Sequence, residues 1–150
     1  MTGPGGRPTA VLFACGMNAV RSPMVAGITR FLFPNQIYVR SAGVRQGELD
    51  PFVDAVMSEI GVDTSRHQPK TFEDLDESGF DLIVTLAPEA HHKALDMTRT
   101  EAVDVEYWPT MDPTLATGSR DQILDAYRIV RDQLMTRIKK RLEWAPPPSG

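Results

Sequence analysis

Hydrophobic and polar positions along the chain follow two patterns in turn. Short continuous apolar runs are typical of strands buried on both faces, and apolar residues three or four positions apart are typical of the helices that cover such strands. Runs of the first kind lie at Ala10–Cys15, Ile37–Arg40, Phe80–Leu86 and Val103–Trp108. Helical segments follow them, so the pattern predicts four strands that alternate with helices.

Helix start signals support this order. Pro23 stands where proline favours the first turn of a helix, and Asp50 precedes Pro51 as an N-cap. Ser119 and Gln122 form the capping box of a long amphipathic helix. Strands and helices that alternate in this way predict an α/β domain with a parallel sheet and helices on both faces. Ligands bind such sheets beyond the carboxyl ends of the strands.

The chain has 150 residues, enough for one domain with a full hydrophobic core. Glycine and proline dominate residues 1–8, which we expect to form a flexible leader. Residues 145–150 (APPPSG) have the composition of a disordered tail. No long polar linker interrupts the chain between these ends, so residues 9–144 are predicted to form a single domain.

Composition and charge are those of an ordinary globular protein. Hydrophobic residues make up 41% and charged residues 24%, which argues against wholesale disorder. The net charge of −4 lacks the basic excess typical of nucleic-acid binders, so no nucleic-acid partner is expected. No apolar run approaches the roughly 20 residues of a membrane helix, and no segment resembles a signal peptide. We therefore expect no membrane partner and a cytoplasmic location.

The chain contains a single cysteine, Cys15. One thiol cannot form an intramolecular disulfide or a zinc site built from several thiolates. An isolated cysteine is most often a small buried hydrophobe. Cys15, however, ends the first predicted strand, at the edge of the sheet where ligands bind, so its neighbours decide between the two roles.

The residues after Cys15 are typical of a phosphate-binding loop. Five residues separate Cys15 from Arg21, and Ser22-Pro23 then starts a helix. A loop of this length can turn its backbone N–H groups towards a common centre, where they bind an anion. The positive end of the following helix lies at the same place, and Arg21 adds a planar pair of donors that matches phosphate oxygens. The same positive field favours a Cys15 thiolate, which would lie beneath a bound phosphorus.

A second chemical group is expected at the same edge of the sheet. A thiolate displaces an alkoxide or phenolate more easily when a general acid protonates the leaving oxygen. Asp112-Pro113 follows the fourth predicted strand, so Asp112 is a candidate for this acid. An Asp-Pro pair also starts turns, and position alone leaves both interpretations open.

Together these residues resemble the low-molecular-weight protein tyrosine phosphatases. That family carries a Cys-x5-Arg-Ser loop after its first strand, a Ser-Ala-Gly turn after its second and an Asp-Pro acid before its last helix. The corresponding residues here are Cys15 to Ser22, Ser41-Ala42-Gly43 and Asp112-Pro113. The resemblance extends from about Thr9 to Leu142. It implies a doubly wound four-stranded parallel sheet with strand order 2-1-3-4.

The resemblance also implies a phosphocysteine mechanism. Cys15 would attack phosphorus, and Asp112 would protonate the leaving oxygen and then activate the hydrolytic water, while Arg21 and the loop N–H groups stabilise the equatorial oxygens. The phosphate-binding residues are Gly16, Met17, Asn18, Ala19, Val20, Arg21 and Ser22. Asn18, Ser22 and Ser41 match positions that brace the loop through hydrogen bonds. His67 resembles a family histidine that supports the same loop. No metal or organic cofactor is implied.

The chain departs from the family pattern at two places. Family loops commonly have glycine directly before the asparagine, whereas this chain has Met17, which a positive φ would strain. Well-known eukaryotic members carry aromatic residues after the Asp-Pro pair, where this chain has Thr114 and Leu115. Trp108 is one candidate for the missing ring-binding wall, although a tryptophan at a strand end more often belongs to the core or its rim. Tyr127 is expected to serve in packing.

The leading interpretation is a cysteine-dependent phosphomonoesterase, with a phosphorylated protein or a small phosphomonoester as substrate and phosphotyrosine as the preferred group. An arsenate reductase is the nearest alternative. Its thioredoxin-coupled form relays oxidation through further cysteines that this chain lacks, so only a form that uses an external thiol stays open. A third alternative is a catalytically silent module that binds phosphate or phosphoproteins, although such a module would need neither Cys15 nor Asp112. The chain is expected to be a monomer or a weak dimer.

Overall fold

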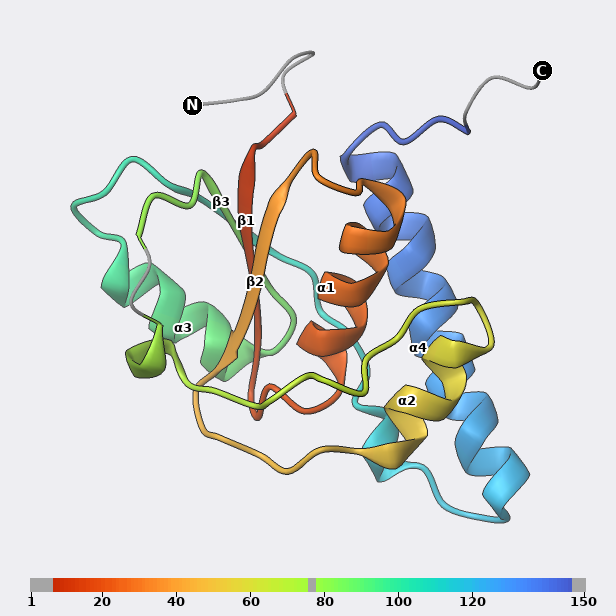
Figure 1. The fold of residues 1–150 in the computed structure, drawn as a ribbon. Coiled ribbons are helices and arrows are strands. Elements are labelled where there is room, and N and C mark those ends of the chain that lie inside the picture. Colours follow the sequence, from red (N-terminus) through yellow and green to blue (C-terminus); the bar gives the residue numbers. More distant parts are fainter. Residues whose placement is uncertain (1–6, 76–77, 147–150) are drawn as a thin grey trace.

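The structure, a computed structural model, describes residues 7–75 and 78–146. Its strands are β1 (Ala10–Cys15), β2 (Tyr38–Gly43), β3 (Leu82–Thr85) and β4 (Asp104–Tyr107). Its helices are α1 (Arg21–Leu32), α2 (Pro51–Ser58), α3 (Pro88–Met97) and α4 (Arg120–Arg141), with short 3-10 helices η2 (Phe72–Asp74) and η3 (Pro113–Leu115). The strands are parallel in the order β2-β1-β3-β4, which confirms the predicted fold and strand order (Figure 1).

The side chains of β1 alternate between the two faces of the sheet. Val11 and Phe13 belong to the core on one side, and Leu12 and Ala14 belong to the core on the other. Since both faces are buried, the strand is a continuous apolar run rather than an alternating one. The apolar runs that predicted β3 and β4 are longer than these strands, because the ladder between them spans only four residue pairs.

Helices cover both faces of the sheet, as the sequence predicted. Figure 1 shows α3 against one face and α1, α2 and α4 on the other side. The larger core includes Met24 and Ile28 of α1 and Leu134 of α4. On the opposite side, Ala90 and Ala94 of α3 pack in the smaller core. With both faces covered, the edges of the sheet are where a ligand can reach the strands.

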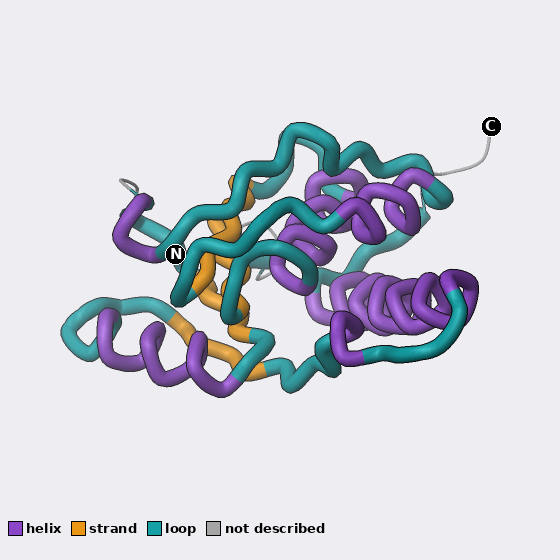
Figure 2. The backbone as a smooth tube through the Cα atoms, turned by 90° about the horizontal axis from the view of Figure 1, so that it is seen from below, coloured by secondary structure: helices purple, strands orange, loops and turns teal. Residues whose placement is uncertain are grey.

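The carboxyl ends of the strands lie at one edge of the molecule. Figure 2 views the molecule from this end and shows loops passing in front of the strands. Because the strands are parallel, Cys15 at the end of β1 and the segment that follows Tyr107 of β4 leave the sheet on the same side. This is the edge at which the sequence places the chemistry.

The ordered domain begins earlier than predicted. Pro8 is buried, and Arg7 donates a hydrogen bond to Gln36 and lies over the ring of Phe33. The last two residues of the predicted leader therefore pack against the domain, because the ring and the amide provide contacts for Arg7. The remainder of the leader (residues 1–6) and the end of the predicted tail (residues 147–150) lie outside the described residues, and their flexibility stays a prediction.

Candidate active site

The loop between β1 and α1 has its carbonyl groups directed outward. Each carbonyl from Cys15 to Asn18 accepts a hydrogen bond from another part of the chain. The donors are the backbone N–H groups of Val44, Arg45 and Gly47 and the ring of His67. In residues 7–75 and 78–146, no hydrogen bond outside the helices and strands uses an N–H group from Gly16 to Val20. Within the described residues these N–H groups are left without a protein partner, as an anion-binding nest requires.

Residues 44–47 are a part of the site that the sequence did not reveal. The backbone N–H groups of Val44, Arg45 and Gly47 hold three loop carbonyls. Backbone donors leave no residue-type signal, so no motif could have identified them.

The first turn of α1 adds a positive field at the same centre. α1 begins at Arg21, one residue before the expected start near Ser22, and Pro23 lies in its first turn as predicted. Its N-cap Val20 provides no side-chain hydrogen bond. An uncapped helix start has unpaired N–H groups and the positive end of the helix dipole. The nest and the helix end therefore offer donors and positive charge to one oxyanion.

Cys15 lies at the base of this loop, with only 2% of its surface exposed. Its Sγ atom is 3.0 Å from Oγ of Ser22. The same Oγ accepts a hydrogen bond of 2.9 Å from Nδ2 of Asn18, which leaves the hydroxyl hydrogen free to point at the sulfur. Asn18 and Ser22 thus occupy the positions that bracing of the loop requires.

Asn18 takes the left-handed backbone conformation of the loop, with φ of 54°. Asparagine adopts this conformation more readily than most residues. Its buried side chain is hydrogen-bonded at both ends, since Oδ1 accepts from the backbone N–H of Lys70 at 2.9 Å and Nδ2 donates to Ser22. Met17 does not have a positive φ. The strain considered for Met17 is absent, because the positive φ falls one residue later.

His67 supports the loop from behind. Its Nε2 atom lies 2.7 Å from the carbonyl oxygen of Asn18, and because a carbonyl only accepts, Nε2 carries the hydrogen. Burial lowers the pKa of His67; the hydrogen bond to Asn18 opposes this, and the nearby charges of Lys70 and Arg30 lower the pKa further. A neutral ring that donates from Nε2 fits the supporting position that the sequence suggested.

The Ser41-Ala42-Gly43 turn contacts the loop through its glycine. A Cβ atom on Gly43 would lie 2.7 Å from the backbone nitrogen of Asn18 and 2.8 Å from the carbonyl carbon of Met17. Only glycine lets the end of β2 approach this closely. Ser41 is buried opposite Phe13 of β1. The described residues show no side-chain hydrogen bond from Ser41 to the loop, so its bracing role stays a prediction.

Arg21 connects the loop to the segment that carries Asp112. Its Nη1 atom donates to the carbonyl of Thr110 at 2.9 Å and lies 3.5 Å from the carbonyl of Leu86. Within the described part of the chain, Nε and Nη2 make no hydrogen bond. One side of the guanidinium therefore positions the residue, and the other donors are available to an oxyanion.

Asp112 is half-buried and caps η3. Its Oδ1 atom accepts hydrogen bonds from the backbone N–H of Thr114 at 3.0 Å and from its hydroxyl at 2.7 Å. The described residues provide no partner for Oδ2. The cap holds the carboxyl group in place while one oxygen stays free to exchange a proton.

One cavity of about 480 Å³ brings the three predicted chemical groups together. Cys15, Arg21 and Asp112 all line it. Phe52 of α2 and Tyr127 of α4 line it as well, and their rings meet at a centroid distance of 5.3 Å. The ring of Phe52 is partly exposed and provides an aromatic wall, whereas the ring of Tyr127 is 2% exposed and packs against it in the core.

Tyr127 does more than pack. Its hydroxyl donates to Oδ2 of Asp50 at 2.6 Å, while Oδ1 of Asp50 caps α2. Burial, followed by the bond to Asp50, raises the pKa of Tyr127. Trp108, the earlier candidate for the wall, is 3% exposed and donates to Glu106, so it belongs to the core. The sequence could not distinguish these roles, because both rings occupy apolar positions of their elements.

Two further features, a metal-binding cluster and a membrane-spanning helix, were sought in residues 7–75 and 78–146. These residues contain no cluster of three or more histidine, cysteine, aspartate or glutamate side chains that could hold a metal ion. None of their helices is long and apolar enough to cross a lipid bilayer.

Comparison with known proteins decides the family. The model of the low molecular weight phosphotyrosine protein phosphatase family matches residues 10–145. The chain belongs to this family. The loop after Cys15, the segment with Asp112 and all four strands lie within the matched residues.

Some relatives of this phosphatase-family protein are named arsenate reductases, and others are named tyrosine phosphatases. An arsenate reductase of Bacillus subtilis is 30% identical over 133 residues, which cover 89% of this chain and 94% of that protein. The low molecular weight protein tyrosine phosphatase of T. tengcongensis has a TM-score of 0.75 and 25% identity, covering 90% of this chain and 98% of that chain. An arsenate reductase in its phosphate-binding state has a TM-score of 0.72 and 26% identity, covering 90% and 97% of the two chains. The names of these relatives do not distinguish phosphate ester hydrolysis from arsenate reduction, so the choice depends on the residues of the site.

Proposed function

We propose that this protein is a cysteine-dependent phosphomonoesterase that acts through a phosphocysteine intermediate. The observation that carries the proposal is the shared cavity, in which the thiol of Cys15, the guanidinium of Arg21 and the carboxyl of Asp112 meet. A module that only binds phosphate needs a nest and a cation, but it needs neither a nucleophile nor an acid.

In the first step, the Cys15 thiolate attacks the phosphorus of the bound ester. A bond forms between sulfur and phosphorus, and the bond between phosphorus and the leaving oxygen breaks. Asp112, in its protonated form, donates a proton from Oδ2 to that oxygen. The loop N–H groups and the free donors of Arg21 stabilise the charge on the equatorial oxygens.

In the second step, water replaces the cysteine. Asp112, now a carboxylate, removes a proton from a water molecule whose oxygen bonds to phosphorus, and the bond between sulfur and phosphorus breaks. Phosphate leaves and the Cys15 thiolate returns. The hydroxyl of Ser22, 3.0 Å from Sγ, stabilises this thiolate as a leaving group.

The substrate class follows from the wall of the cavity. The partly exposed ring of Phe52 provides aromatic surface in the cavity that Asp112 also lines, and the buried ring of Tyr127 packs against it. This surface suits the ring of an aryl phosphate such as phosphotyrosine. The proposed substrates are phosphotyrosine in proteins and small aryl phosphomonoesters. A cytoplasmic location and a monomer or weak dimer stay predictions.

Arsenate reduction is a second candidate, because several relatives of this chain are named arsenate reductases. Arsenate would bind in the same loop and bond to Cys15. Reduction of As(V) to As(III) needs two electrons from a pair of thiols, and this chain contains only one. A soluble thiol would have to supply the second, forming a mixed disulfide with Cys15 that a further thiol molecule then resolves.

The proposed function is tested by turnover of para-nitrophenyl phosphate by the wild type and by the Cys15→Ser variant. We expect activity in the wild type, at least a 10³-fold loss in the variant, and phosphate binding in both. Thiol-dependent consumption of arsenate without ester hydrolysis would replace this proposal with the reductase. Phosphate binding without either reaction would replace it with the silent module.

A further inference from the structure

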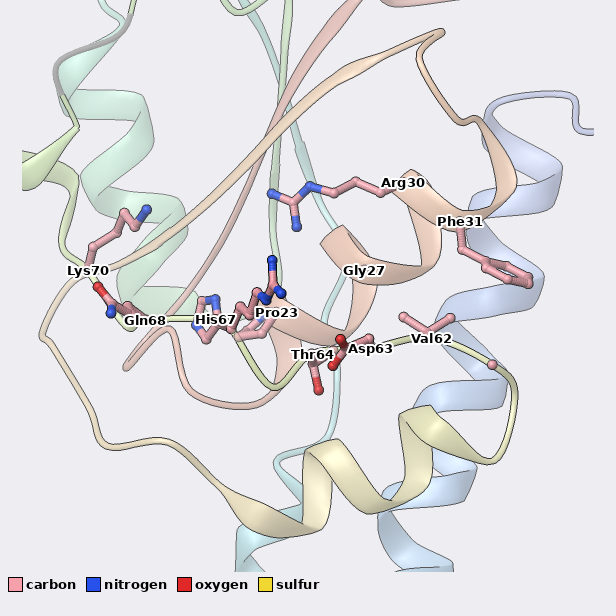
Figure 3. Close-up of a pocket in the computed structure, with 12 residues that line it drawn as sticks. Pro23, Gly27, Arg30, Phe31, Val62, Asp63, Thr64, His67, Gln68 and Lys70 are labelled. Carbon is pink, nitrogen blue, oxygen red and sulfur yellow. The ribbon is translucent and has the colours of Figure 1, made fainter.

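A second cavity, of about 520 Å³, lies behind the phosphate loop, between α1 and the segment from Gly61 to Lys70. We call it the rear cavity. Figure 3 shows Arg30 extending from α1, with His67 and Lys70 on the facing segment. The proposed reaction uses none of the side chains of Arg30, Arg66 and Lys70, which all line this cavity.

The rear cavity carries an excess of positive charge. Three cationic side chains line it, those of Arg30, Arg66 and Lys70, against one carboxylate, that of Asp63. Oδ1 of Asp63 already accepts hydrogen bonds from the backbone N–H and the hydroxyl of Ser65. Among the described residues, no carboxylate lies within ion-pair distance of any of the three cations. This excess of positive charge favours an anionic ligand.

The same cavity is in contact with the residues that hold the phosphate loop. His67 lines the cavity and donates to the carbonyl of Asn18. Lys70 also lines it, and its backbone N–H donates to Oδ1 of Asn18. Asn18 donates in turn to Ser22, whose hydroxyl contacts Cys15. A ligand that moves His67 or Lys70 therefore acts on the loop within a short chain of hydrogen bonds.

We propose that the rear cavity binds a small, multiply charged, phosphate-bearing anion, and that this ligand alters the phosphate loop through His67 and Lys70. The volume of the cavity lies within the range of small-molecule sites. Two arginines and a lysine within one cavity match a ligand with several phosphate groups. The site does not depend on the proposed reaction, since none of its cations takes part in it.

The test is an NMR titration with inorganic tripolyphosphate, which reports where the probe binds. The phosphate loop would bind the same probe, so the titration uses the Arg21→Ala variant, in which the loop has lost its guanidinium. We expect the backbone amides of Gly27, Gly61 and Lys70 to shift and to saturate together. Adding Arg66→Gln and Lys70→Gln to the Arg21→Ala variant should raise the dissociation constant for tripolyphosphate at least tenfold. Both substitutions keep the backbone N–H of residue 70.

The matched control removes two exposed cations elsewhere, with Arg99→Gln and Lys140→Gln in the same background, and should leave the dissociation constant within twofold. Chemical-shift changes confined to residues 16–22 would overturn the site. So would equal affinity for tripolyphosphate in the Arg21→Ala protein, the protein with Arg66→Gln and Lys70→Gln added, and the control protein. The coupling is read from the side-chain amide signals of Asn18. They should shift at the same probe concentration as Gly27 and should stay unmoved in the Arg66→Gln/Lys70→Gln protein. Asn18 shifts that persist there would contradict the coupling.

Discussion

Gly43 and Gly16 both border the phosphate loop, but the structure requires glycine at only one of them. A Cβ on Gly43 would meet the backbone of Met17 and Asn18, which has no room to move without moving the loop. A Cβ on Gly16 would meet only the carboxylate of Glu89, the end of a flexible side chain that pairs with Arg45 in an exposed ion pair.

We therefore predict opposite outcomes for the same substitution. Gly43→Ala should lower the free energy of unfolding by about 1–3 kcal/mol, as overpacking does, and should reduce turnover because the loop is displaced. Gly16→Ala should remain close to the wild type in both properties, since loss of an exposed ion pair costs at most about 1 kcal/mol. Urea denaturation and ester hydrolysis measure the two effects. Similar losses in both variants would contradict this account of the turn.

The Asp112→Asn substitution removes the group that transfers the proton but keeps the local structure around it. An asparagine Oδ1 can still accept both hydrogen bonds from Thr114, so the cap of η3 is kept. The amide cannot donate a proton to the leaving oxygen, and turnover of aryl phosphates should fall by roughly 10²–10⁴. The loss should shrink as the leaving phenol becomes more acidic, and Asp96→Asn, at an exposed position, should have no effect. A loss independent of the leaving group would mean that Asp112 is not the acid.

Residue types and spacing could predict only part of this site. Cys15, Arg21 and Asp112 were predicted from residue type and spacing, and all three line one cavity. Two features could not be identified in this way: the positive φ of Asn18, and the backbone donors of residues 44–47 that direct the loop carbonyls outward. Both depend on contacts between segments that are distant in the sequence, and they involve the backbone more than the side chains.

Among the elements, α2 depends most on its neighbours. It has eight residues, too few for a stable isolated helix. Its N-cap Asp50 is bound by the hydroxyl of Tyr127, and Glu59 at its other end pairs with Arg128 and Arg131 of α4. α4 thereby fixes α2 at both ends and holds Phe52 at the cavity.

Tyr127→Phe should loosen this attachment. Loss of the hydrogen bond to Asp50 should lower the free energy of unfolding by about 1–2 kcal/mol and raise the KM for aryl phosphates, because Phe52 is held less firmly. Tyr107→Phe is the control, since within the described residues its hydroxyl makes no hydrogen bond. Chemical denaturation and steady-state kinetics provide the measurements. Equal behaviour of the two variants would show that α2 is positioned by packing alone.

Element boundaries illustrate what local patterns omit. The capping box of α4 and the Asp50 cap of α2 were predicted correctly, because both signals lie within a few residues. The start of α1 was predicted to within one residue, since Pro23 lies in its first turn. The aromatic wall was missed because local patterns do not show whether Phe52 faces the core or the cavity, which depends on how α2 packs against α4.

For the whole molecule, His67 and Glu59 are two of the groups whose lowered pKa values make stability respond to acid; the hydrogen bonds from Ser65 and Lys93 also lower the pKa values of Asp63 and Glu73. Burial keeps His67 neutral in the folded protein, so below its ordinary pKa of 6.5 the unfolded chain binds more protons than the folded one. Hydrogen bonds from Arg128 and then Arg131 lower the pKa of Glu59 from 4.5 to about 2. Both groups therefore cause stability to fall as the pH falls, in separate windows.

We predict that the wild type loses stability first below about pH 6.5 and again between about pH 4.5 and 2. His67→Gln should reduce the first loss and leave the second, because an amide can still donate to Asn18 but does not titrate. Glu59→Gln should have the reverse effect. Thermal unfolding across pH measures both. A His67→Gln profile that is parallel to the wild type above pH 4.5 would contradict a lowered pKa for His67.

The architecture of the whole molecule was the most predictable level, because alternating strands and helices have few ways to pack, and the family resemblance supplied the strand order. How α2, α4 and residues 61–70 surround the loop was not predictable, and these contacts determine both cavities.

The central claim is that Cys15 becomes phosphorylated during turnover. The most direct measurement is rapid quenching of the Asp112→Asn variant with para-nitrophenyl phosphate, followed by mass spectrometry of its peptides. In that variant the hydrolytic step lacks its base, so the intermediate should accumulate. We predict one added phosphoryl group on the peptide that contains Cys15, and none when Cys15 is also replaced by serine. Hydrolysis by the wild type with no modified Cys15 peptide in the variant, or with the phosphoryl group on another residue, would contradict the mechanism.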